Sequence, residues 1–125
     1  MDTQGATTWF IPDGYLATPQ GSDPNYKNHE SICVLNTTSQ DAQLTIDFYF
    51  ADRAPLHAVG IVIPAERCYH LRIDLPEQIG GCVLPFDTPY GARLHSDVPV
   101  VVQYSRMYAT IQNISLMTTM AFPIS

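Results

Sequence analysis

The side chains best suited to hold a polar ligand in this chain are a histidine and two arginines in stretches that favour β-strands. His70 and Arg72 are two residues apart, so on a strand they point to the same side of a sheet. Arg106, with Gln103 before it, ends an apolar run that would need neither side chain if it served only a core. Imidazole, guanidinium and amide groups bind carboxylates, phosphates and hydroxyl-rich molecules. The pattern therefore predicts a site for a small polar ligand at the ends of strands.

The same side chains have a second interpretation, because a buried polar or charged group without a partner is costly. In that interpretation each strand arginine pairs with a carboxylate, within one chain or across a subunit interface. The candidate carboxylates are Asp47, Asp74, Asp87 and Asp97. The residues alone give the two interpretations equal weight.

Catalytic patterns fit this sequence poorly. His29 and Glu30 are adjacent, so on a strand they point to opposite faces and could not share one proton or one metal ion. We interpret them as residues at the start of a strand. The chain has no nucleophile elbow, no His-Glu-x-x-His motif and no glycine-rich phosphate loop, and its histidines and cysteines lack the spacing of metal ligands. We expect no catalytic residue, no metal and no cofactor; a cupin-like enzyme, which would require a bound metal, is the least favoured function.

Aromatic residues form the remaining pool from which a binding site could draw. Aromatic rings stack on sugars and bases, but they fill β-sandwich cores more often. Trp9 is the exception that we single out, because it lies in a polar-flanked segment close to a predicted turn at Gly14 and Tyr15. We expect Trp9 to form one wall of a pocket.

The elements that must position these residues are short strands. Residues 31–36 are apolar on both faces, and residues 44–50 alternate apolar and polar side chains. We expect these two strands to form a hairpin through a polar loop. A second predicted hairpin joins residues 58–63 to residues 67–73.

The rest of the chain also favours an antiparallel β-structure. Prolines and glycines predict a long loop over residues 75–94. Residues 98–104 are a predicted buried strand that opens at a Ser-Asp turn, and residues 116–122 are the predicted last strand. Residues 17–28 are a predicted exposed loop, and residues 110–115 either a helical turn or part of a hairpin. Together these elements predict one all-β domain over residues 1–125, an antiparallel β-sandwich of about seven or more short strands, with a barrel as the neighbouring alternative.

Charge and cysteine usage narrow the class of protein further. Twelve acidic and six basic residues give a formal net charge of −6, which disfavours nucleic-acid binding. Only 14% of the residues are charged, which indicates that part of the surface is covered, as in an oligomer. Three cysteines cannot form a complete disulfide framework, the first basic residue is Lys27, and the apolar runs are too short to span a membrane. We expect a cytoplasmic protein without a secretion signal or direct membrane insertion.

With these residues placed, the sequence resembles the sensory rhodopsin transducer family, a group of small soluble all-β proteins. The resemblance covers nearly the whole chain and departs in residues 76–90, where Gly80-Gly81-Cys82 is specific to this sequence. Its most specific pieces are Trp9 with Gly14-Tyr15, His29-Glu30-Ser31 leading into Cys33-Val34-Leu35-Asn36, Asp41-Ala42, Pro64-Ala65-Glu66-Arg67 with His70 and Arg72, and residues 98–103 with Ser105-Arg106.

The resemblance implies a non-enzymatic binding or signalling role. It implies a β-sandwich subunit in a cyclic homotetramer, a sugar or related metabolite as ligand, and a signalling or membrane-receptor partner that is a rhodopsin only for some members. An adaptor or assembly protein without a ligand, whose polar strand ends form subunit interfaces, is the alternative. The family pattern marks eight ligand-binding or interface positions: Trp9, His29, Glu30, Arg67, His70, Arg72, Gln103 and Arg106.

Overall fold

The computed structural model describes residues 4–20, 27–110 and 112–124, and in these ranges the chain forms antiparallel strands with one short 3-10 turn. This confirms the predicted all-β class. The elements are β1 (Ala6–Tyr15), β2 (His29–Asn36), β3 (Ala42–Phe50), β4 (Leu56–Ile63), β5 (Arg67–Arg72), η2 (Pro76–Gln78), β6 (Pro89–Ala109), β7 (Ile114–Met120) and β8 (Phe122–Ile124).

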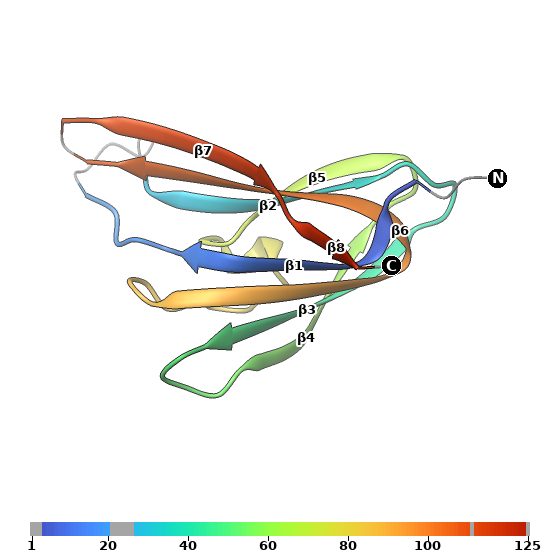
Figure 1. Ribbon diagram of the computed structural model, residues 1–125, viewed down its shortest axis with the longest axis horizontal. Helices are drawn as coiled ribbons and strands as arrows, with labels where there is room; N and C mark the ends of the chain where they lie inside the picture. Colours follow the sequence, from blue (N-terminus) through green and yellow to red (C-terminus); the bar gives the residue numbers. More distant parts are fainter. Residues whose placement is uncertain (1–3, 21–26, 111, 125) are drawn as a thin grey trace.

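The strands are arranged in two layers that share one long strand, β6 (Figure 1). The first half of β6 pairs with β1 and β3, and its second half pairs with β2 and β7. One layer therefore has the order β4-β3-β6-β1-β8, and the other has the order β5-β2-β6-β7. We call them the β3 layer and the β2 layer.

The bend of β6 lies at the Ser-Asp pair that we expected to begin a strand. The Ser96 hydroxyl accepts a hydrogen bond from the Val98 N–H at 3.3 Å, and the Asp97 carboxylate accepts one from the Gln43 N–H at 2.8 Å. The Ser96 bond is local, and local side-chain bonds of this kind compete with a regular ladder. The register of β1 on β6 shifts between His95 and Val100, so the predicted turn is an irregularity within one continuous strand.

The core lies between the two layers and takes the inward residues of each strand. The predicted alternation in β3 is confirmed, since Leu44, Ile46 and Phe48 are buried. From the β2 layer, Ile32 and Val102 pack against them in the same cluster. Burying one such side chain contributes roughly 1.5–3 kcal/mol, so this face decides the position of each strand.

Both predicted hairpins are wrong. β2 pairs with β5 and β6, whereas β3 pairs with β4 and β6, so β2 and β3 lie in different layers, and so do β4 and β5. The β2–β3 and β4–β5 connections are arches that cross from one layer to the other, and the two arches are hydrogen-bonded to each other. The Asn36 amide donates to the Ile63 carbonyl at 3.1 Å, and the Glu66 N–H donates to the Thr38 carbonyl at 3.1 Å. The polar loop residues are thus satisfied by the other arch and do not need a hairpin.

Two further segments differ from the sequence-based expectation. The breaker-rich stretch is a loop only as far as residue 88, because β6 begins at Pro89. The segment around Trp9 is strand β1, which continues through the predicted turn at Gly14 and Tyr15. Of the two alternatives for the segment before the last long strand, the hairpin describes the chain, since Ala109 of β6 pairs with Ile114 of β7. Residue 111 and part of the 17–28 loop lie outside the described residues.

Candidate functional site

The eight positions marked by the family pattern fall on different faces of the sandwich. His70 and Gln103 lie on the outer face of the β2 layer, where Cys33 of β2 pairs with both. Half-buried His29 is at the start of β2, and its Nδ1 lies 2.8 Å from the Lys27 carbonyl oxygen. Arg67 is exposed at the start of β5 and donates to the Glu66 carbonyl at 3.0 Å.

Trp9 lies inside the sandwich, with 5% of its surface exposed. Its indole N–H points to the Ala6 carbonyl at 3.0 Å and to the Val100 carbonyl at 3.1 Å. Both carbonyls belong to the region where β1 crosses the bend of β6. The indole therefore ties two strands together within the core.

Arg72 is held by a carboxylate of its own chain. Its Nε and Nη2 donate to the two carboxylate oxygens of Asp74, each at 2.8 Å, and Lys27 Nζ lies 3.4 Å from the same group. Burial tends to raise the pKa of Asp74, but the Arg72 guanidinium and the Lys27 charge outweigh it, and the pKa lies below its ordinary value. Asp74 is one of the four carboxylates expected as partners, so for Arg72 the ion-pair interpretation describes the structure.

Arg106 and Glu30 form the centre of a buried polar network. The Arg106 Nε donates to Glu30 Oε2 at 2.9 Å, and its Nη2 donates to the Asp13 carbonyl at 2.9 Å. Glu30 is 1% exposed and also accepts hydrogen bonds from the Tyr15 N–H and the Tyr90 hydroxyl. Burial and the adjacent Glu30 raise the pKa of Tyr90, so its hydroxyl remains a donor. The network therefore links β1, β2 and β6 to one another.

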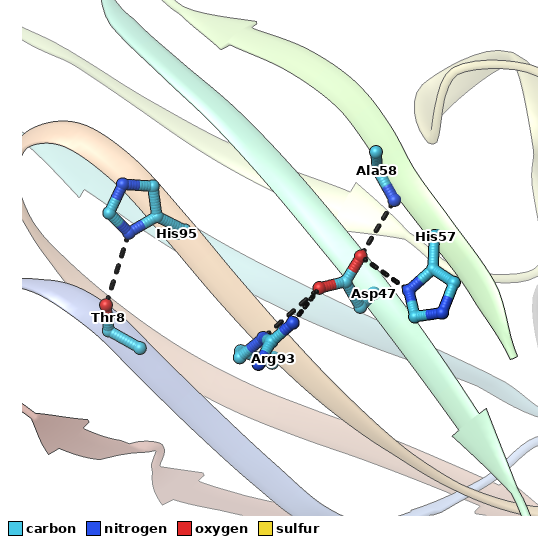
Figure 2. A network of polar contacts seen from close by, with 6 residues as sticks. All are labelled: Thr8, Asp47, His57, Ala58, Arg93 and His95. Carbon is cyan, nitrogen blue, oxygen red and sulfur yellow. Dashed lines mark hydrogen bonds and ion pairs between the residues drawn. The ribbon is translucent and has the colours of Figure 1, made fainter.

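A second polar network lies on the outer face of the β3 layer (Figure 2). Asp47 accepts hydrogen bonds from Arg93 at 2.7 and 3.1 Å and from the Ala58 N–H at 2.8 Å, and His57 Nδ1 lies at 3.3 Å. Burial tends to raise the pKa of Asp47, but these hydrogen bonds hold it below its ordinary value. Ala58 has a left-handed backbone with φ of 56°, which its bond to Asp47 holds in place. This network shapes the connection between β3 and β4.

A groove of about 600 Å³ lies between β4 and β5, the end strands of the two layers. Of the eight marked positions, His70 alone lines it. Its lining consists of Gly60, Ile61, Cys68, Tyr69, His70, Leu71, Glu77, Gln78 and Gly80. Sequence reasoning missed most of these residues because it paired β4 with β5 as a hairpin. No local signal marks them, since they meet only when the two layers stack.

Metal ligands, cysteines and apolar helices are further features to consider in the described part of the chain. No group of three histidine, cysteine or acidic side chains there could hold a metal ion, and Cys33, Cys68 and Cys82 are all unpaired. No helix among the described residues is long and apolar enough to cross a membrane.

Comparison with known proteins extends these observations. A family model described as Anabaena sensory rhodopsin transducer matches residues 4–123. A crystal structure of Thermotoga maritima protein 1070 is 34% identical with a TM-score of 0.85, over 98% of this chain and 97% of that one. The structure of the Anabaena sensory rhodopsin transducer is 33% identical with a TM-score of 0.70, over 82% of this chain and 89% of that one. No curated protein matches the sequence. The resemblance inferred from the sequence is confirmed, and the chain belongs to the Anabaena sensory rhodopsin transducer family.

Proposed function

We propose that this protein is a non-enzymatic signalling module that binds a small polar ligand in the groove between β4 and β5 and reports its binding to a partner protein. The observation that supports the ligand is the groove itself. Its volume of about 600 Å³ lies in the range typical of small-molecule sites, and it combines an apolar wall with the polar groups of His70, Glu77 and Gln78.

The arginines change the ligand class expected from the sequence. Arg72 is paired with Asp74 and Arg106 with Glu30, and neither arginine lines the groove. Glu77 is the one residue with a formal charge in the groove lining. A neutral or cationic ligand fits this lining better than a carboxylate or a phosphate. Sugars and related metabolites remain within that class.

The remaining parts of the proposal rest on family membership. The name of the Anabaena relative describes a transducer for a sensory rhodopsin, so a receptor or other signalling partner is proposed for this chain. A cytoplasmic location and a cyclic homotetramer belong to the same proposal.

Thermal unfolding tests the ligand site, because a ligand that binds only the folded state raises the midpoint temperature. Neutral sugars, polyols, amino acids and short peptides at millimolar concentration form the panel. Tyr69→Ala, which removes the wall of the groove, is expected to abolish the shift. Tyr108→Ala is the matched control, since Tyr108 is 43% exposed against 41% for Tyr69 and does not line the groove. A panel without any shift, or the same shift in Tyr69→Ala, contradicts the proposal.

An adaptor that binds no small molecule is the second candidate. Every residue of β7 and β8 is exposed, and the large apolar side chains among them include Leu116 at 74% and Phe122 at 65%. Exposed apolar side chains gathered on neighbouring strands are typical of protein–protein contact surfaces. This surface favours assembly through β7 and β8.

A further inference from the structure

The free edge of β5 faces the groove with unused backbone groups. In an antiparallel pair, alternate residues direct both their N–H and C=O groups to the partner strand. The Ile73 N–H donates to the Glu30 carbonyl at 2.9 Å, and the register continues this pattern through Leu71 and Tyr69. The backbone groups of Cys68 and His70 therefore point away from β2, and both residues line the groove.

Arg72, the next residue in this outward row, shows how such groups become satisfied. Its N–H donates to Gln78 Oε1 at 2.9 Å, and its carbonyl accepts from the Leu75 N–H at 3.3 Å. The segment after β5 thus covers the edge at Arg72 and stops there. Among the described residues, none bonds to the outward backbone groups of Cys68 or His70. An uncovered strand edge of this kind is a template for pairing with another chain.

The opposite wall of the groove is formed by β4, which pairs only with β3 among the described strands. Gly80 lies against this strand, since a Cβ added at Gly80 would be 3.2 Å from the Gly60 carbonyl oxygen, so the uncovered edge is that of β5. A strand added to β5 would continue the β2 layer in its own plane, about 4.8 Å from β5. Side chains of Ile61, Tyr69 and Leu71 line the inside of this space.

We propose that the ligand of the groove is a peptide segment in extended conformation, which adds to β5 as a further strand. The inference rests on the proposed function and names the ligand class of the same site. Binding by strand addition uses main-chain hydrogen bonds for affinity and alternate side chains for selectivity. Apolar side chains of the peptide would face Ile61, Tyr69 and Leu71, and the others would face solvent.

The occupant must be a single extended segment of a partner protein with basic side chains. A second copy of this chain carries the same net charge of −6, which disfavours it as the occupant. Glu77 supplies the only formal charge of the lining, and the chain carries a net charge of −6, so a basic segment is attracted and an acidic one repelled.

Position 70 offers a test that separates backbone from side-chain recognition. Proline is tolerated in an edge strand where the N–H faces outward, so His70→Pro removes the outward donor and keeps the ladder to β2. His70→Ala is the matched control that keeps the N–H. The probes are capped pentapeptides that alternate lysine with valine, leucine or tyrosine, the same peptides with every backbone nitrogen methylated, and glutamate-containing counterparts. Binding is measured by calorimetric titration, with glucose as a neutral sugar probe.

We expect the lysine peptides to bind wild type and to bind His70→Ala within about threefold, whereas His70→Pro and backbone methylation each weaken binding about tenfold or more. At low salt, the glutamate peptides are expected to bind more weakly than the lysine peptides. Equal binding of methylated and unmethylated peptides overturns the inference, even if His70→Pro fails to fold. Glucose binding without peptide binding also overturns it but leaves the proposed function intact. Failure of every compound in the wider panel refutes both.

Discussion

Arginine side chains in this protein differ in how deeply their carboxylate partners are buried. Glu30, the partner of Arg106, is 1% exposed, whereas Asp47, the partner of Arg93, is 15% exposed on the outer face of the β3 layer, and Arg93 itself is 45% exposed. A buried carboxylate that loses its partner keeps the cost of leaving water, whereas a surface pair is screened by solvent. The two arginines therefore contribute differently to the free energy of unfolding.

Removal of Arg106 measures this difference. Arg106→Ala is expected to lower the free energy of unfolding by about 3 kcal/mol, because Glu30 is left buried without its cation. Arg93→Ala is the control and is expected to cost at most about 1 kcal/mol. Urea unfolding monitored by circular dichroism gives both values. Equal losses for the two variants would show that Glu30 does not depend on Arg106.

Asp74 makes the stability of the fold depend on pH. Its pKa in the folded state lies below the value of about 3.9 in an unfolded chain, since Arg72 and Lys27 favour the carboxylate. A lowered folded-state pKa stabilises the protein above the unfolded value, and this contribution is lost as the pH falls through the folded-state pKa. Asp74→Asn is therefore expected to destabilise the protein at neutral pH and to flatten the loss of stability below about pH 5.

Thermal unfolding between pH 7 and pH 2.5 checks this expectation. Glu66→Gln, which changes an exposed carboxylate without an ion pair among the described residues, serves as the control and should leave the acid slope unchanged. The same slope in Asp74→Asn and wild type would contradict a role for the Arg72–Asp74 pair.

At the scale of elements, the approach of β1 to β6 depends on a glycine. Gly14 pairs with Tyr90, and a Cβ at Gly14 would lie 2.2 Å from the Tyr90 ring. This close approach allows the Tyr90 hydroxyl to reach Glu30 between the layers. The end of β1, the start of β2 and the start of β6 are therefore positioned together.

Gly14→Ala tests this arrangement. We expect it to lower the free energy of unfolding by about 1–3 kcal/mol, because the Tyr90 ring must move from its position in a close-packed core. Gly60→Ala is the matched control, since a Cβ there meets nothing within 4 Å, and its effect should stay within about 0.5 kcal/mol. Chemical denaturation compares the two variants. An unchanged free energy of unfolding in Gly14→Ala would mean that the Tyr90 ring can move without cost.

The whole molecule carries apolar surface that a single chain leaves uncovered. β7 and β8 are the end strands of the two layers on the side opposite to β5 and β4, and their exposed side chains include Leu116, Met117, Met120 and Phe122. If this surface joins copies of the chain, charged substitutions there must separate the copies. Leu116→Glu with Phe122→Glu is expected to convert the assembly to monomers in light scattering.

Val83→Glu is the control for that experiment. Val83 is also apolar and is 72% exposed, close to the 74% of Leu116, but it lies in the loop before β6. We expect the Val83 variant to keep the assembly. An unchanged molar mass in the double variant would exclude β7 and β8 as the subunit contact, and a monomeric wild type would refute the homotetramer.

Local sequence patterns predicted several elements because their causes are local. The alternation of Leu44, Ile46 and Phe48 required one buried face, and the apolar run after Pro99 required a strand buried between neighbours. His29 and Glu30 stand at the start of β2, as expected from two adjacent residues that face opposite ways. These inferences used only the period of a strand.

Strand partners could not be inferred in the same way. Asn36 and Thr38 are as compatible with a hairpin loop as with an arch, and the arch forms because the Ile63 carbonyl and the Glu66 N–H lie within reach. Those groups are about 27 residues further along the chain, so the choice depends on how the layers stack. The groove between β4 and β5 is a consequence of that choice.

The sequence by itself determined the all-β class, the family and the set of polar residues on strands, because composition, alternation and motifs are properties of the chain. Only the tertiary structure decided what those residues do. Arg72 and Arg106 found carboxylates in their own chain, Trp9 became part of the core, and His70 came to line a groove beside the free edge of β5. The physical reason is that partners of buried charges and free edges of strands are fixed by contacts between distant segments.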